Sequence, residues 1–186
     1  MKTRRGDWIQ TYTGKAFWPL DPRLEDIDIR DIAHSLAYQC RFAGHCHPFY
    51  SVAQHSVFVS QLVSARHAGW GLMHDAAEAY ITDLPRPLKR SLFGDHFCCV
   101  EEEILKIIAK AFHLPPEIPS EVHHADDRML MTEARDLMGK APMPWGLRVK
   151  PIKSDFECWS PQFAEVMFLS RSRQLFKDIP EYWTGE

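Results

Sequence analysis

The chain has 186 residues, of which 45% are hydrophobic and 25% are charged, and its formal net charge is −3. These values are typical of soluble globular proteins and exclude a disordered chain, which combines few apolar residues with a large net charge. A chain of this length forms one domain by default, so we expect a single domain over residues 1–186. The slight negative charge argues against a nucleic-acid partner, whereas a small phosphorylated ligand needs only a few local cations.

Cysteine spacing and hydropathy predict a cytoplasmic protein. The five cysteines include no C-x-x-C pair, which argues against a disulfide framework and against a structural zinc site. No stretch approaches the ~20 apolar residues of a membrane helix, and residues 1–10 lack the apolar core of a signal peptide. We therefore expect no membrane partner. Histidine, with ten residues, is the unusual component, and it is the commonest metal ligand.

The N-terminal region differs from the rest of the chain. Residues 6–22 contain short β-prone runs on both sides of Thr13-Gly14, a turn signal, and therefore predict a small hairpin. An isolated hairpin is only marginally stable, so we expect it to pack on a larger body. After Pro22 the apolar spacing becomes helical. We expect a first helix that Asp26 or Asp28 caps and that ends near Gly44.

Helical periodicity continues through the rest of the chain. We expect helices over residues 51–65, 68–80, 95–112, 120–138 and 161–176, a short helix through Lys89, and a long irregular loop over 139–161. No run of buried parallel strands is present. The sequence therefore predicts an all-α fold, a compact helical bundle with a small N-terminal β-hairpin.

A cluster of histidine and acidic residues interrupts one Ala-rich predicted helix. His74 and Asp75 are adjacent, Glu78 follows His74 by one helical turn on the same face, and Asp83 lies one loop further on. Acidic side chains on an apolar helix are costly to bury without a partner, and a metal ion would be such a partner. An ion-pair cluster at a helix end is the alternative.

Two further residues complete a candidate ligand set. His55 is polar in the middle of an apolar stripe, and Asp126 follows His123-His124-Ala125. Two imidazoles and two carboxylates suit Mn, Co, Ni, Fe or Zn, with Mg less favoured. A satisfied core histidine at His55 and a solvated or capping carboxylate at Asp126 are the alternatives. Asp127 directly follows Asp126, so the sequence leaves open which of these two carboxylates is the ligand.

The order His55 … His74-Asp75 … Asp126 resembles the metal signature of the HD-domain phosphohydrolases. The segment from His74 to Lys89, H-D-x-x-E-x-x-x-x-D-L-P-x-P-x-K, is similar to a small subgroup of this family. That subgroup includes bacterial 5′-deoxynucleotidases and phage deoxynucleoside triphosphate hydrolases, and its V-A-E-H-S motif resembles V-A-Q-H-S around His55. The resemblance covers about residues 28–138 and leaves the hairpin and residues 139–186 outside.

The resemblance implies metal ligands at four positions, catalytic carboxylates at two and substrate contacts at three. The implied metal ligands are His55, His74, Asp75 and Asp126. The implied catalytic carboxylates are Glu78 and Asp83, and the implied substrate contacts are Arg41, Phe42 and Lys89. Glu78 would move a proton, and Asp83 would orient the attacking water. Arg41 and Lys89 would contact phosphate, and Phe42 follows Arg41 where the subgroup often has a tryptophan against the sugar.

The function that the resemblance implies is metal-dependent hydrolysis of 2′-deoxynucleotides. The favoured reaction is that of a deoxynucleoside triphosphate triphosphohydrolase that releases triphosphate, with dATP as the first choice of substrate. A 5′-deoxynucleotidase that releases phosphate from deoxynucleoside monophosphates is the alternative. An inactive nucleotide-binding regulator is an alternative of another class, against which Glu78 and Asp83 argue. The resemblance also implies a homo-oligomer in a bacterial or phage-infected cytoplasm.

Overall fold

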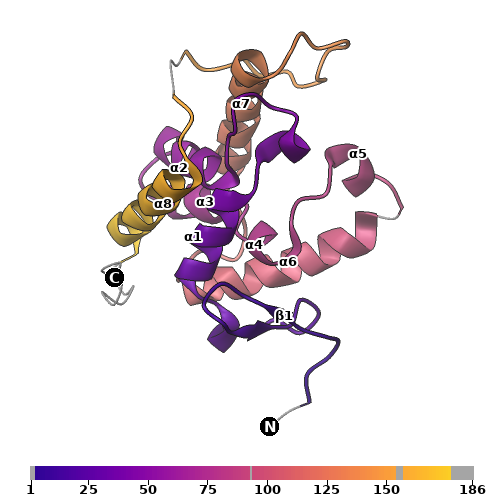
Figure 1. The fold of residues 1–186 in the computed structure, drawn as a ribbon, viewed down its shortest axis with the longest axis vertical. Helices are drawn as coiled ribbons and strands as arrows, with labels where there is room; N and C mark the ends of the chain where they lie inside the picture. Colours follow the sequence, from indigo (N-terminus) through magenta and orange to yellow (C-terminus); the bar gives the residue numbers. More distant parts are fainter. Residues whose placement is uncertain (1–2, 93, 154–156, 177–186) are drawn as a thin grey trace.

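A computed structural model describes residues 3–92, 94–153 and 157–176 of the chain (Figure 1). The described residues are mostly helical, with one two-stranded hairpin near the N-terminus. The expected all-α class with an N-terminal hairpin is therefore confirmed. No helix in these ranges is both long enough and apolar enough to cross a membrane.

The hairpin pairs β1 (Ile9–Gln10) with β2 (Ala16–Phe17) in antiparallel orientation. Phe17 is fully buried and stacks on Tyr80, with the ring centroids 3.9 Å apart. The hairpin thus packs on the helical body, as its marginal intrinsic stability requires. A short 3-10 helix, η1 (Leu24–Asp26), leads from the hairpin into the bundle.

The first helix, α1 (Ile29–Tyr38), begins at Asp28, whose side chain accepts a hydrogen bond from the Arg30 amide at 3.0 Å. Its expected end near Gly44 is wrong, because the chain leaves the helix after Tyr38.

The segment after α1 is extended because it pairs with the chain just before α2. The Arg41 amide donates to the Tyr50 carbonyl at 2.9 Å, and the Val52 amide donates to the Gln39 carbonyl at 3.1 Å. These backbone bonds replace the helical ones. A short turn, η2 (Arg41–Gly44), follows and carries Arg41, and inside it Phe42 and Ala43 have left-handed backbones instead of helical ones.

Helix α2 (Val52–Leu62) lies at the centre of the bundle, in contact with α1, α3, α7 and α8 (Figure 1). Ser51 caps it by accepting a hydrogen bond from the Gln54 amide at 3.1 Å. Most of its residues are buried, including the polar Gln54, His55, Ser56 and Ser60. Polar groups at such positions need partners inside the protein.

The single helix expected over residues 68–80 is wrong, because the structure divides it into α3 (Ala68–Met73) and α4 (Glu78–Ile81). Between them the backbone bonds span three residues instead of four, as from the Glu78 amide to the Asp75 carbonyl at 3.0 Å. The tighter turn presents His74 and Asp75 at the end of α3.

The remaining helices lie close to their predicted ranges. They are α5 (Arg86–Lys89), α6 (Gly94–Ala111), α7 (Ser120–Leu137) and α8 (Pro161–Leu175). Residues 139–153 and 157–160 contain no helix or strand, as expected for the long loop, while 154–156 lie outside the described residues. Helix α8 packs across α1, α2 and α3 and closes the bundle.

Candidate metal centre

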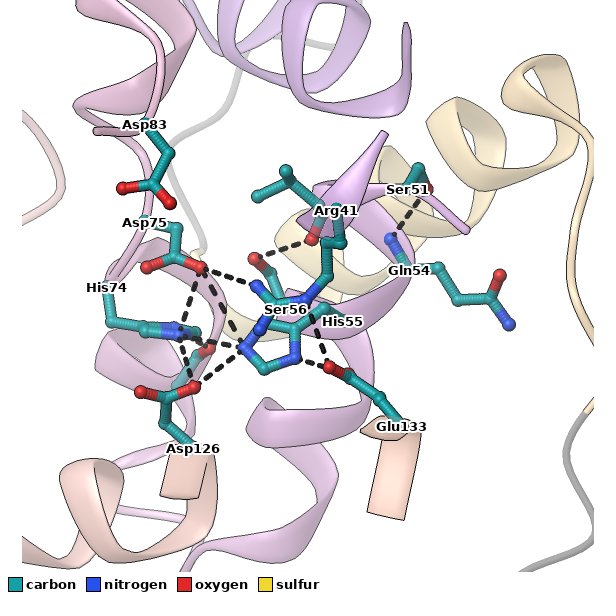
Figure 2. A network of polar contacts seen from close by, with 12 residues as sticks. Arg41, Ser51, Gln54, His55, Ser56, His74, Asp75, Asp83, Asp126 and Glu133 are labelled. Carbon is teal, nitrogen blue, oxygen red and sulfur yellow. Dashed lines mark hydrogen bonds and ion pairs between the residues drawn. The ribbon is translucent and has the colours of Figure 1, made fainter. Parts of the chain in front are cut away.

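The imidazoles of His55 and His74 approach each other through their Nε2 atoms at the centre of the candidate site (Figure 2). The Nε2 atoms of His55, on α2, and of His74, directly after α3, lie 3.3 Å apart. Asp75 Oδ2 lies 3.3 Å from His74 Nε2 and 3.8 Å from His55 Nε2. The ligand atoms of these three residues all lie within 4.8 Å of one another, so the group could hold a metal ion.

A fourth predicted ligand approaches from α7. Asp126 Oδ1 lies 3.1 Å from His55 Nε2 and 4.0 Å from His74 Nε2. The neighbouring Asp127 instead pairs with Arg86, with 3.6 Å between Asp127 Oδ1 and the guanidinium. The fold therefore brings Asp126, and not Asp127, to the two imidazoles.

The outer nitrogens of both histidines have hydrogen-bond partners. His55 Nδ1 lies 2.6 Å from Glu133 Oε1, and His74 Nδ1 lies 2.9 Å from the Gly71 carbonyl oxygen. Carboxylate and carbonyl oxygens only accept, so both Nδ1 atoms carry a proton, and each ring can offer a lone pair to a cation at Nε2 once that nitrogen is deprotonated. Metal-ligating histidines are typically oriented in this way. Two such lone pairs beside two carboxylates fit a cation.

The charges of the surrounding side chains also favour binding of a cation. Burial and Arg41 disfavour a charged His55, but Glu133 and Asp126 outweigh them and raise the pKa of His55 to about 9. Burial would raise the pKa of Asp126, yet His55, His74 and Arg41 lower it below its ordinary value. The field at the centre therefore stabilises positive charge between the imidazoles.

Glu133 belongs to this site although no motif of the sequence points to it. It is fully buried on α7, and its two oxygens bind different partners, His55 Nδ1 through Oε1 and Arg41 Nε through Oε2 at 3.0 Å. Burial opposes its charge, but Arg41 and His55 lower the pKa of Glu133 to about 2. The available signal was its place seven residues after Asp126, which is the same helix face two turns later.

Arg41 lies at the edge of the centre. Besides Glu133, its guanidinium reaches Asp75, with 3.5 Å between Nη1 and Oδ2. The ring of Phe42 lies beside it, 5.7 Å from the Arg41 Cζ atom to the ring centroid. The two predicted substrate contacts of η2 are therefore adjacent to the candidate ligands.

The predicted catalytic carboxylates have contrasting environments. Glu78, the first residue of α4, is buried, and the described residues give its carboxyl group no hydrogen-bond partner. Burial, followed by the charges of Asp75 and Asp83, raises the pKa of Glu78 well above its ordinary value. Asp83 is half-exposed and pairs with Lys89 at 2.9 Å. Lys89 also pairs with Glu101 at 2.9 Å, so it lies between two carboxylates.

A close approach of two helices brings the histidines together. A Cβ atom on Gly71 of α3 would lie only 2.7 Å from the Cα of Ser60 on α2 and 3.0 Å from its amide nitrogen. Glycine therefore lets the two backbones touch. This contact places the end of α3, with His74, beside His55.

Comparisons with known proteins identify relatives of the chain. No family model matches it. YfdR, an uncharacterized protein of Escherichia coli K12, is 49% identical over 130 residues, which cover 70% of this chain and 72% of YfdR. The chain belongs to the YfdR family. An uncharacterized protein of Rhodobacter capsulatus, RCAP_rcc00048, is 32% identical over 127 residues, which cover 63% of this chain and 64% of that relative. Neither relative's name states an activity.

Proposed function

We propose that this member of the YfdR family is a metal-dependent phosphohydrolase of the HD-domain type that acts on 2′-deoxynucleotides. The observation that carries the proposal is the convergence of His55 and His74 Nε2, 3.3 Å apart, with the carboxylates of Asp75 and Asp126. A buried acid of raised pKa, Glu78, carries a charge interaction with Asp75. A purely structural ion cluster would not require such an acid.

The donor set favours a borderline transition metal. Two imidazoles and two carboxylates suit Mn, Co, Ni, Fe or Zn better than Mg. When bound, the ion supplies Lewis-acid polarisation of a phosphoryl oxygen and lowers the pKa of water. Glu133 keeps the His55 ring oriented through Nδ1, as outer partners of metal ligands do.

The chain's own side chains handle the substrate around this centre. The guanidinium of Arg41 offers positive charge to the phosphoryl group, whose transfer depends mainly on positioning and electrostatics. Glu78 gives a proton to the leaving group or takes one from water, and Asp83 orients that water. Lys89 contacts a phosphate only by exchanging its pair with Asp83 or Glu101.

The favoured reaction is hydrolysis of a deoxynucleoside triphosphate with release of triphosphate, and dATP is the first substrate to test. Product analysis separates this reaction from the alternatives. Metal-stripped protein is supplied with Mn²⁺ or Co²⁺ and given each deoxynucleoside mono- and triphosphate, and the products are resolved by ion exchange. Triphosphate supports the favoured reaction, and phosphate from monophosphates alone supports a 5′-deoxynucleotidase. No product from metal-loaded protein would refute the hydrolase and favour a nucleotide-binding regulator.

Variants test the individual roles. Glu78→Gln should lower turnover at least about 100-fold, the usual contribution of general acid–base catalysis, without changing metal content. Asp126→Asn should lose metal, whereas Asp127→Asn, the matched control on the next residue, should retain it. Turnover by Glu78→Gln at the wild-type rate would remove Glu78 from the mechanism.

A further inference from the structure

The loop between α7 and α8 brings an aromatic side chain to the segment that carries Arg41. The Trp145 ring meets the Phe42 ring edge-on, with the centroids 6.0 Å apart and the planes at 76°. Trp145 remains 42% exposed, and among the described residues its indole N–H has no hydrogen-bond partner. Large aromatic side chains are usually buried or bound through their polar end. Trp145 thus offers an open aromatic surface.

Phe42 connects this surface to the metal centre. Its ring lies 5.7 Å from Arg41 Cζ, and Arg41 in turn reaches Asp75 at 3.5 Å. Phe42 and the following Ala43 both have left-handed backbones, with φ of 56° and 50°. Non-glycine residues keep such conformations only where their surroundings impose them, and these residues concentrate at ligand sites. The Phe42 ring of this turn thus lies near both the Arg41 guanidinium and the Trp145 ring.

The charge of residues 139–153, the part of this loop that contains Trp145, favours an anionic ligand. Residues 139–153 contain no acidic residue and four basic ones, Lys140, Arg148, Lys150 and Lys153. None of the four forms an ion pair with the described residues. A local excess of positive charge raises the local concentration of anions. Aromatic surface and positive charge together are the features that bind single nucleotides and single strands.

We propose that Trp145, together with Phe42, forms the surface on which the nucleobase of the substrate stacks while Arg41 and the metal centre engage its phosphate. This inference rests on the proposed function and adds to it a substrate-binding residue outside the HD-type motifs. Stacking accepts every base because every base has a π-face. Trp145 therefore contributes affinity for nucleosides in general, and base preference arises elsewhere in the site.

Binding of the two halves of the substrate tests the proposal separately from turnover. The probes are 2′-deoxyadenosine, which has no phosphate to lose, and inorganic triphosphate, each titrated by NMR into metal-loaded protein. Trp145→Ala should weaken binding of 2′-deoxyadenosine by about tenfold to a hundredfold, the effect of removing one stacking partner. Trp145→Phe should lose less affinity for 2′-deoxyadenosine than Trp145→Ala, because phenylalanine keeps an aromatic ring. The control is Trp8→Ala, since Trp8 is 52% exposed and directly precedes β1, and β1 and the loop between α7 and α8 lie at opposite ends of the molecule (Figure 1).

Metal content and triphosphate affinity should stay at the wild-type level in Trp145→Ala. Wild-type affinity of Trp145→Ala for 2′-deoxyadenosine would overturn the inference, as would an equal loss of triphosphate binding or a wild-type protein that binds no nucleoside. A Trp145-dependent nucleoside site in a protein that hydrolyses no nucleotide would support the inference and refute the hydrolase. If Trp145→Ala changes neither nucleotide hydrolysis nor nucleoside affinity, the hydrolase is supported and the inference about Trp145 is refuted.

Discussion

Replacing Gly71 with alanine should push His74 away from His55. The added Cβ would lie 2.7 Å from Ser60 Cα, whereas carbon atoms pack favourably at about 3.5–4.0 Å. The atoms that it meets are backbone atoms of the central helix α2, which cannot rotate aside. Helices α2 and α3 must therefore separate by about 1 Å at this point.

The expected effect on stability is small because two contributions oppose each other. Overpacking a tight contact costs about 1–3 kcal/mol, whereas alanine in a helix interior is about 1 kcal/mol better than glycine. The net loss of unfolding free energy is therefore about 0–2 kcal/mol. Metal–ligand distances tolerate deviations of only about 0.2 Å. A shift of about 1 Å between the two Nε2 atoms should therefore lower metal affinity more than it lowers the unfolding free energy. We expect metal affinity to fall about tenfold to a hundredfold.

Competition with a chromophoric chelator measures the metal affinity, and thermal unfolding in excess chelator measures the stability of the metal-free protein. Gly69→Ala is a matched control on the same helix. Its Cβ would meet the side chains of Leu114 at 2.8 Å and Phe176 at 3.2 Å, which can move, instead of backbone. If Gly71→Ala and Gly69→Ala bind metal equally tightly, the backbone contact does not set the distance between the histidines.

Two further predictions concern charged groups. Glu133→Gln should weaken metal binding about tenfold to a hundredfold, because the His55 ring loses the carboxylate that orients it; the same competition assay would contradict this if affinity were unchanged. Asp28 has a pKa lowered from 3.8 to about 2, because Arg30 and Lys15 outweigh the effect of burial. Its ionised form therefore adds stability at pH values above about 4, and this stability is lost as the pH falls towards 2. In urea unfolding, the difference between wild type and Asp28→Asn should be constant from about pH 5 to 7 and shrink below about pH 4; a difference that persists to pH 2 would refute the assignment.

Apolar periodicity predicts the long helices of this fold well, because their buried faces repeat with the helical period. Helices α6, α7 and α8 begin and end near the predicted residues. The predicted helix bounds are wrong where contacts with distant segments, instead of local periodicity, determine the backbone conformation. Pairing of Gln39 and Arg41 with the chain before α2 ends α1 early, and the tight turn at residues 74–77 divides an Ala-rich stretch.

The predicted ligands lie together in the fold, although they come from α2, the turn after α3, and α7. His55, His74 and Asp75 form one group, and Asp126 reaches both imidazoles. Glu133 could not be recognised in this way, since a lone acid on an amphipathic helix is usually solvated. Its spacing from Asp126 places it on the same face of α7, but only the fold shows that its carboxylate binds His55 and Arg41. The pairing of Lys89 with Glu101 likewise depends on how α5 packs against α6, which no local pattern encodes.

The carboxylate of Glu133 is shared between His55 and Arg41, and this sharing constrains which substitutions the chain tolerates at either residue. A substitution that moves Arg41, which under the proposed function contacts phosphate, also disturbs Glu133 and with it the orientation of His55, and the reverse holds as well. Residues in one hydrogen-bonded network have effects that are not additive. In a protein with the proposed function, substrate preference and metal preference are therefore expected to change together, so that a substitution of Arg41 or His55 is tolerated only where a second substitution already compensates for it.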